Sequence, residues 1–198
     1  MPFLLELDRK LSDRHSVPLG DLAHILCSAF YPAATDLYDY GDTPFLRCVD
    51  IINHPILTPD QPYANIPADF IKDHSSVRCI KGGDIVISKV GSPCFAGLLD
   101  ESMPLCAMTR TILGLRNIRT NLVDPRYLVI FLRSSIGFDQ LMRERELTIQ
   151  YQLTLDRTRK IRVYLPSMKE QRQIGDLLTQ HIEQDSRSKA LYAQAENL

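Results

Sequence analysis

Arginine is concentrated in one stretch of this chain, and its planar guanidinium group suits recognition of phosphates and of guanine base edges. Residues 110–162 carry 11 basic residues against 5 acidic ones, and ten of the basic residues are arginine. Residues 1–109 carry 8 basic against 14 acidic residues, so the net charge of −1 hides an asymmetry. Two interpretations stay open on charge alone: a nucleic-acid-binding surface, or exposed faces that are paired with the acidic half.

Sequence patterns that mark common enzyme sites are absent. The chain has no P-loop, no H-E-x-x-H, no G-x-S-x-G and no G-x-G-x-x-G, and no Asn-Pro-Pro-Tyr-type motif of amino-methyltransferases. Asp69 and Lys72 in ADFIK resemble a nuclease fragment only faintly, because no upstream acidic partner stands in a clear frame. The sequence therefore predicts no catalytic residue, no metal site and no bound cofactor, and it favours a binding module.

Cysteine usage and hydropathy narrow the class of protein further. The five cysteines are scattered without a C-x-x-C pair, which indicates small apolar core residues rather than disulfides or a zinc site. No apolar run approaches the roughly 18–20 residues of a membrane span, and the N-terminal stretch reaches Glu6 without the features of a secretory signal. We therefore expect a cytoplasmic protein without a membrane anchor.

The elements that must position the arginines are mostly short strands. Residues 77–116 contain four apolar runs separated by Gly, Ser and Pro, which predicts a series of short strands. PFLRCVDII, residues 44–52, alternates in polarity and is a further strand candidate. Residues 54–70 carry four prolines, so we expect irregular structure there. Residues 143–166 return to strand character before Pro166.

Two helices have clear start signals. Asp124-Pro125 predicts a helix start, and apolar residues at helical spacing continue through Ile136 until Gly137 breaks the pattern. Ser167 with Glu170 forms a capping-box pattern, from which a helix of roughly 48 Å could run to the chain end.

The C-terminal helix carries an interrupted apolar stripe. Ile174 to Ile182 form its first part, which we expect to pack on the chain's own domain. Polar residues interrupt the stripe before it resumes at Leu191, Ala195 and Leu198. Such a broken seam is weak as an isolated dimer zipper, so the second part predicts a surface for a partner helix.

Four blocks in order resemble a target-recognition domain of a type I restriction-modification DNA specificity subunit. They are GDTPFLRCVDI, GDIVISKVGSPCFAGLLDE, VDPRYLVIFLRSS and LTLDRTRKIRVYLPSMKEQRQIGDLL, and the resemblance covers about residues 17–198. It implies an α+β fold: a twisted mixed β-sheet target-recognition domain with flanking helices, followed by a long C-terminal helix that acts as a coiled-coil spacer. The implied divisions are an N-terminal arm or helix (1–16), the recognition domain (17–166) and the C-terminal helix (167–198).

The resemblance also implies a function. Family members usually carry two such domains, so this chain resembles a half-subunit or a fragment that reads one half of a split duplex DNA target without catalysing anything. The implied partners are adenine-N6 methyltransferase subunits, which use S-adenosylmethionine, an ATP-driven restriction subunit where cleavage occurs, and a second half-subunit or copy of the chain. Three alternatives stay open: the recognition domain of a fused methyltransferase, a small nuclease or methyltransferase with unrecognised motifs, and a protein-interaction adaptor.

Candidate DNA contacts follow from the resemblance and from side-chain chemistry. Glutamine can bond adenine through two hydrogen bonds, whereas lysine, serine, tyrosine and arginine can reach phosphates. The candidates are Lys89, Ser92, Arg110, Arg116, Arg119, Arg143, Arg145, Tyr151 and Gln152.

Overall fold

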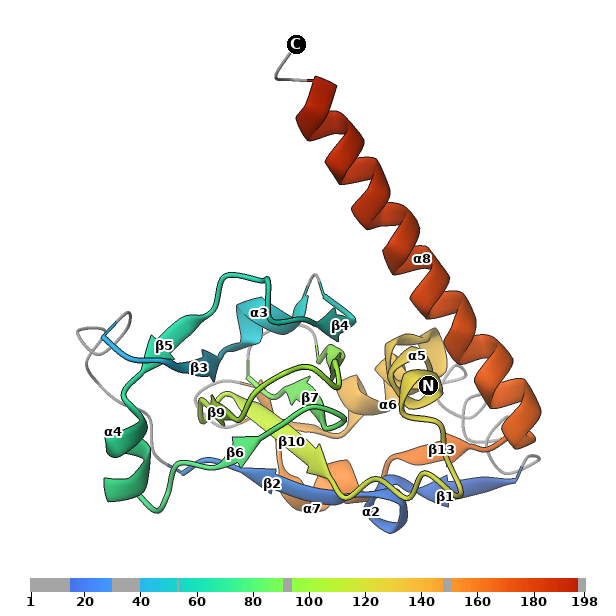
Figure 1. Ribbon diagram of the computed structural model, residues 1–198. Coiled ribbons are helices and arrows are strands. Elements are labelled where there is room, and N and C mark those ends of the chain that lie inside the picture. The colour runs from blue at the N-terminus through green and yellow to red at the C-terminus, as the bar shows by residue number, and fades with distance from the viewer. Residues whose placement is uncertain (1–14, 30–39, 53, 91–93, 148–150, 196–198) are drawn as a thin grey trace.

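The computed structural model describes residues 15–29, 40–52, 54–90, 94–147 and 151–195 (Figure 1). Its strands are β1 (Ser16–Pro18), β2 (His24–Cys27), β3 (Thr43–Leu46), β4 (Ile56–Leu57), β5 (Ala64–Ile66), β6 (Cys79–Ile80), β7 (Ile85–Ser88), β8 (Ala96–Leu99), β9 (Cys106–Met108), β10 (Ile112–Arg116), β11 (Arg145–Leu147), β12 (Tyr151–Leu153) and β13 (Arg162–Tyr164). Its helices are α2 (Leu19–Leu22), α3 (Cys48–Ile52), α4 (Ala68–Asp73), α5 (Pro125–Arg133), α6 (Ser135–Arg143), α7 (Leu155–Arg159) and α8 (Met168–Ala195).

Two sheets form the centre of the molecule. A five-stranded sheet has the order β2-β10-β7-β8-β4, and a four-stranded sheet has the order β5-β3-β9-β6. Both are mixed, because β4 runs parallel to β8 and β3 runs parallel to β9, while the other pairs are antiparallel. Two small ribbons, β1-β13 and β11-β12, complete the strands that the structure describes. The predicted mixed α+β fold with a C-terminal helix is confirmed.

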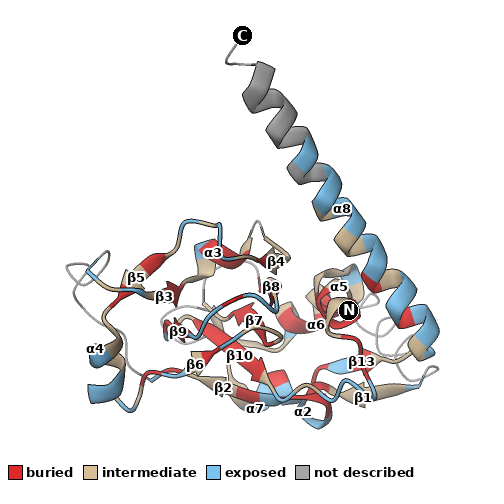
Figure 2. Cartoon of the chain, in the orientation of Figure 1, coloured by how far each residue is buried: buried red, intermediate tan, exposed pale blue. Residues whose placement is uncertain are grey.

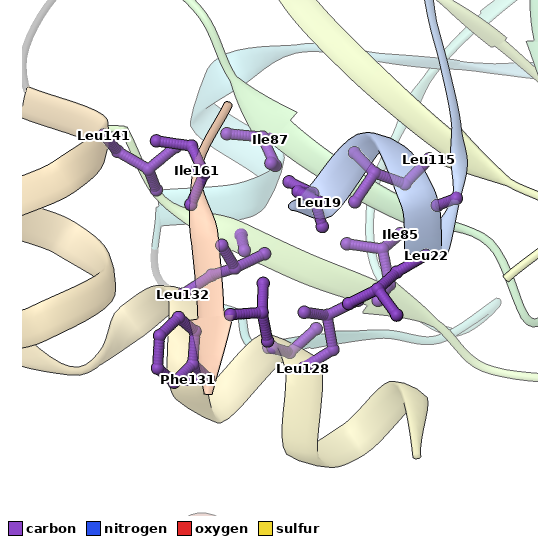
Figure 3. Close-up of a cluster of buried hydrophobic side chains, with 14 of the residues drawn as sticks. Leu19, Leu22, Ile85, Ile87, Leu115, Leu128, Phe131, Leu132, Leu141 and Ile161 are labelled. Carbon is purple, nitrogen blue, oxygen red and sulfur yellow. The ribbon is translucent and has the colours of Figure 1, made fainter. Parts of the chain in front are cut away.

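Strand β7 shows how the sequence builds the layers. Its side chains point alternately to the two faces of the sheet. Ile85 and Ile87 face a cluster that includes Leu128 of α5 and Leu19 of α2 (Figure 3). Val86 faces the opposite side, where the five-stranded sheet packs on the four-stranded one. Both faces of β7 are buried, which explains its continuous apolar run.

A glycine allows the two sheets to approach closely. A Cβ atom on Gly114 of β10 would lie 2.9 Å from the Met108 sulfur and 3.0 Å from a methyl carbon of Ile80. Both neighbours belong to the four-stranded sheet. The position therefore has little room for a side chain, and the glycine in ILGLR is explained by packing between the sheets.

The apolar segment after Asp124 forms two helices instead of one helix that ends at Gly137. Asp124 caps α5 as predicted, since its side chain accepts a hydrogen bond from the Arg126 N–H. The break comes earlier than predicted, at Ser134, which ends α5 and caps α6 through the Gly137 N–H. Gly137 lies in α6, where a Cβ atom would lie only 2.1 Å from the Phe131 carbonyl oxygen. Gly137 thus permits the tight corner between two helices.

Residues 44–52 do not form the single strand that their alternation predicts. Strand β3 ends at Leu46, and α3 starts at Cys48. Arg47 lies between them, and its N–H donates a hydrogen bond of 2.7 Å to the carboxylate of Asp50 in α3. Its guanidinium group forms an ion pair of 3.2 Å with the same carboxylate. This local contact closes a turn. The alternation of polar and apolar residues in the sequence does not indicate such a turn. The proline-rich residues 54–70 include β4, β5 and the start of α4, so they are less irregular than predicted.

Helix α8 begins with the predicted capping box and extends away from the sheets (Figure 1). The Glu170 carboxylate accepts hydrogen bonds from the Ser167 N–H and hydroxyl group, while the Glu170 N–H donates to the Ser167 hydroxyl oxygen. Near its start α8 packs against α5, and Ile174 joins the core cluster. Leu177 is 63% exposed, so only part of the first apolar stripe packs on the domain as predicted (Figure 2).

All five cysteines carry free thiols. Cys94 and Cys106 are buried, and burial raises the pKa of Cys94 to about 11 and that of Cys106 to about 12. Cys27, Cys48 and Cys79 are half-buried. The interpretation as core residues therefore holds fully only for Cys94 and Cys106.

Candidate nucleic-acid interface

The predicted DNA contacts from the middle of the chain separate into two groups, one at each end of strand β10. Lys89 and Arg110 lie where β10 begins. Gln152, which belongs to strand β12, lies next to Lys89. Arg116 is the last residue of β10, and Arg119 follows it at the opposite end. The strand that lies between the groups spans Ile112–Arg116, about 13 Å of extended chain.

The backbone of Lys89 joins three segments that are distant in the sequence. Its N–H donates to the Thr111 carbonyl at 2.8 Å, and its carbonyl accepts from the Leu153 N–H at 3.0 Å. Val90 forms an antiparallel bridge with Gln152. The turn around Arg110 and the β11-β12 hairpin are therefore held next to Lys89. We call residues 89–90 and 109–111 together with β11 and β12 the hairpin end.

Pairing in the hairpin fixes the direction of its side chains. Arg145 lies opposite Leu153, and Glu146 lies opposite Gln152. Residues directly opposite each other share one face of a sheet, and Leu153 is fully buried. Arg145 consequently shares the inward face, where its Nε donates to the Met142 carbonyl at 3.3 Å. Gln152 shares the outward face with Glu146, and this is the orientation that a base-reading side chain needs.

An arginine that sequence reasoning missed neutralises the acidic residues of the hairpin. Arg157 of α7 lies 2.9 Å from a Glu146 carboxylate oxygen and 3.3 Å from one of Glu144. Arg143, a predicted DNA contact, lies 3.5 Å from the other Glu144 oxygen. Helix α7 is capped by Thr154, whose side chain accepts from the Arg157 N–H. That Thr154 cap is the sequence signal that could have indicated the helix.

The turn that carries Arg110 is stabilised by side chains that no sequence pattern singles out. The hydroxyl oxygens of Thr109 and Thr111 lie 2.6 Å apart. The Cys48 thiol donates to the Thr111 carbonyl at 3.1 Å. Arg110 lies between the two threonines with an exposed side chain. Arg110 is thus carried by a braced turn, and no local motif indicates the contribution of Cys48.

At the opposite end of β10, Arg116 lies beside a buried carboxylate. Its Nε lies 3.6 Å from an Asp84 carboxylate oxygen. Burial raises the pKa of Asp84, and the Lys81 N–H at 3.0 Å and the charge of Arg116 offset this only in part. Arg119 donates its backbone N–H to the Leu22 carbonyl at 2.9 Å, while its side chain is exposed.

The hairpin end offers charge and hydrogen-bonding groups. Lys89 has no side-chain partner within the described part of the chain. The described residues include no group of three His, Cys, Asp or Glu that could hold a metal ion. The arrangement offers groups that can contact phosphates and base edges.

Some predicted residues fall where the structure gives no side-chain position. Ser92 and Leu198 lie outside the described residues, as do the side chains of Tyr151, Leu191 and Ala195. Strand β12 and helix α8 nevertheless place the backbones of the last three.

A comparison of the sequence with protein families identifies the family of the chain. The family model described as "Type I restriction modification DNA specificity domain" matches residues 12–197. The chain belongs to this family. The expected resemblance is thereby confirmed, and the family places the chain among DNA specificity domains of type I restriction-modification systems.

Solved structures share the fold of this specificity domain. The S subunit from M. genitalium matches with a TM-score of 0.61 and 12% identity, covering 93% of this chain and 43% of that one. The HsdS subunit from Thermoanaerobacter tengcongensis matches with a TM-score of 0.58 and 19% identity, covering 94% and 45%. A chain solved for complex assembly and conformational transition of the type I R-M system matches at 0.59 and 19%, covering 92% and 41%.

This specificity domain spans less than half the length of the solved chains that it matches. No curated protein matches its sequence significantly. Within the described residues, no helix is both long and apolar enough to cross a membrane.

Proposed function

We propose that this specificity domain recognises one half of a split duplex DNA target and positions adenine-N6 methyltransferase subunits on it. The observation that carries the proposal is the meeting of Lys89, Arg110 and Gln152 at the hairpin end, although three separate segments supply them. A lysine and an arginine can hold phosphates while a neighbouring glutamine reads a base edge. Membership of a DNA specificity family supports the same conclusion.

The share of the solved chains that this chain spans supports the reading of half a target. The match covers 41–45% of their length, so in this proposal one recognition domain and one helix correspond to half of such a subunit. In this proposal the domain catalyses nothing. Methylation belongs to partner subunits that use S-adenosylmethionine, and cleavage belongs to an ATP-driven restriction subunit.

Duplex binding and its dependence on salt test the proposal. We expect a labelled duplex to bind at about 50 mM salt and to dissociate steeply as salt rises, with a log-log slope of about −0.9 for each phosphate contacted. Affinity for the isolated half is expected to be modest, because half a target supplies half the contacts. Fluorescence anisotropy, with and without the methyltransferase subunits, measures both quantities.

A double variant makes the assay specific to the hairpin end. Lys89→Ala with Arg110→Ala removes two exposed or half-exposed charges there, and we expect the slope to fall by about 1.8. Absence of duplex binding by the wild-type chain, alone and with the methyltransferase, would contradict the proposed function.

A further inference from the structure

Two adjoining depressions lie along strand β2, which pairs with β10 from Leu113 to Arg116. One holds about 330 Å³ and includes Arg119 and Arg159 in its lining. The other holds about 360 Å³ and includes Arg78 and Arg116. His24 lines both of them, so they form one continuous surface. We call this surface the β2 track. Among the residues that the structure describes, β2 is an edge strand of the five-stranded sheet.

The four arginines of the track come from separate segments and converge on the edge strand. Arg78 precedes β6, Arg116 ends β10, Arg119 follows β10, and Arg159 ends α7. The sequence predicts only Arg116 and Arg119 of them as DNA contacts. Arg78 lies within the acidic residues 1–109, and Arg159 lies in a segment that the sequence predicts to be strand. Their convergence is therefore a tertiary feature.

The charges of the track are only partly compensated within the chain. Arg159 pairs with Asp156 at 2.5 Å, and Arg116 lies 3.6 Å from Asp84. Arg78 and Arg119 are exposed and have no side-chain partner among the described residues. Asp21 also lines the track, but it forms no ion pair with Arg119. The two unpaired guanidinium groups are thus available to an anionic partner.

The track begins close to the hairpin end. Leu155, three residues after Gln152, lines the second depression. The Arg78 N–H donates to the Ser28 hydroxyl oxygen at 2.9 Å, next to the Cys27–Leu113 pair near the start of β10. A duplex whose base edges meet Gln152 can therefore lay a flanking phosphate strand along β2. Arginine's fork matches the oxygens of such phosphates.

We propose that the β2 track binds the sugar-phosphate backbone of the same duplex, through Arg78, Arg116, Arg119 and Arg159. This inference rests on the proposed function and assigns two kinds of contact to two surfaces. The hairpin end reads bases, whereas the track binds phosphates irrespective of sequence. Arg78 and Arg159 become DNA contacts on this basis. Contacts of this kind fix the register of a protein on DNA without carrying sequence information.

The test compares salt dependence in a double variant of the full chain. Arg78→Ala with Arg119→Ala removes the two unpaired charges, so the log-log slope should fall by about 1.8. Between about 50 and 200 mM salt, the wild type should therefore lose about twelvefold more affinity than the variant. Fluorescence anisotropy with a labelled duplex measures this, and circular dichroism verifies that the variant is folded.

Matched variants separate a local contact from a change of net charge. Arg172→Ala with Arg187→Ala removes two exposed arginines from α8 and should leave the slope unchanged. Arg78→Lys with Arg119→Lys keeps the charge and should restore most of the wild-type slope. A randomised-site selection should return the same preferred sequence for the wild type and the alanine double variant.

The outcomes distinguish the two proposals. If the wild type binds duplex and the Arg78/Arg119 alanine variant keeps the wild-type slope, the track is wrong while the proposed function stands. An equal loss of slope in the α8 control, or an altered sequence preference, also overturns the track. If the wild type binds no duplex at all, the proposed function fails and the track fails with it.

Discussion

Gln152 is the residue whose surroundings best fit a base-reading role. It lies on the outward face of the hairpin, opposite Glu146, and its strand is bridged to Val90 next to Lys89. The ion pair between Glu146 and Arg157 neutralises the nearest carboxylate, which removes a repulsion that would otherwise oppose an approaching phosphate strand. At the scale of single residues, the side chain that we propose as the base reader thus lies among acidic groups that are paired with arginines.

We expect Gln152→Ala to reduce discrimination at one base pair by about 1–3 kcal/mol, because two hydrogen bonds to one base edge are lost. Affinity for unrelated sequences should change little. A randomised-site selection followed by anisotropy on matched and mismatched duplexes measures the effect. Gln173→Ala, an exposed glutamine on α8, is the control. Identical preferences for wild type and Gln152→Ala would show that Gln152 does not read a base.

At the scale of elements, the joint between α5 and α8 determines how the long helix leaves the domain. Gln171 is 1% exposed, and its side chain accepts from the Asp124 N–H and donates to the carbonyls of Leu122 and Pro166. Arg126 lies 3.0 Å from Asp124 and 2.6 Å from Asp176 of α8. The residues around Asp124, which caps α5, therefore also hold α8 on the domain.

Asp124 gives this joint a pH dependence. Burial alone would raise the pKa of Asp124, but hydrogen bonds and charge from Arg126 outweigh it and hold the pKa below its ordinary value of 3.8. The stabilisation is therefore complete above pH 3.8 and is lost as the pH falls through the lower folded-state pKa. We expect Asp124→Asn to lower the free energy of unfolding by about 1 kcal/mol near pH 7, with the difference vanishing in acid.

Urea unfolding at a series of pH values measures this difference. Asp156→Asn is the control, because Asp156 forms an exposed pair with Arg159 and exposed pairs contribute about 0–1 kcal/mol. A difference between wild type and Asp124→Asn that persists below about pH 2 would mean that the carboxylate charge is not its source.

At the scale of the whole molecule, α8 is a long helix that is held on the domain at one end. It spans Met168–Ala195, about 42 Å as a helix, and it packs on α5 near its start while its other end extends away from the sheets (Figures 1 and 2). We propose, as the sequence predicts, that a second such helix pairs with the far part of α8. Helix length would then set the distance between two half-sites.

Removal of residues 187–198 should leave the domain folded but lower its oligomeric order or its affinity for the methyltransferase. The anchors at Gln171 and Arg126 remain in such a chain, so folding is not expected to suffer. Light scattering measures the mass, and co-purification with the methyltransferase measures partner binding. An unchanged mass together with unchanged partner binding would exclude an assembly role for this segment.

The sequence by itself determined the features that depend on near neighbours. The cap at Asp124 and the capping box of Ser167 and Glu170 form as predicted, because each involves hydrogen bonds within three residues. The order of four sequence blocks was sufficient to indicate the family. Both faces of β7 are buried, as its apolar run indicated.

Only the tertiary structure decided which residues meet. Strand pairing places Lys89 beside Thr111 and Leu153, and no local pattern encodes that choice, because hydrogen bonds between strands join residues distant in the chain. The same pairing puts Arg116 at the opposite end of β10 from Arg110 and gathers Arg78 into the β2 track. The count of charges along the sequence identifies the basic stretch. It does not indicate which of its arginines lie at which end of β10, because the strand pairing of the folded sheet decides that.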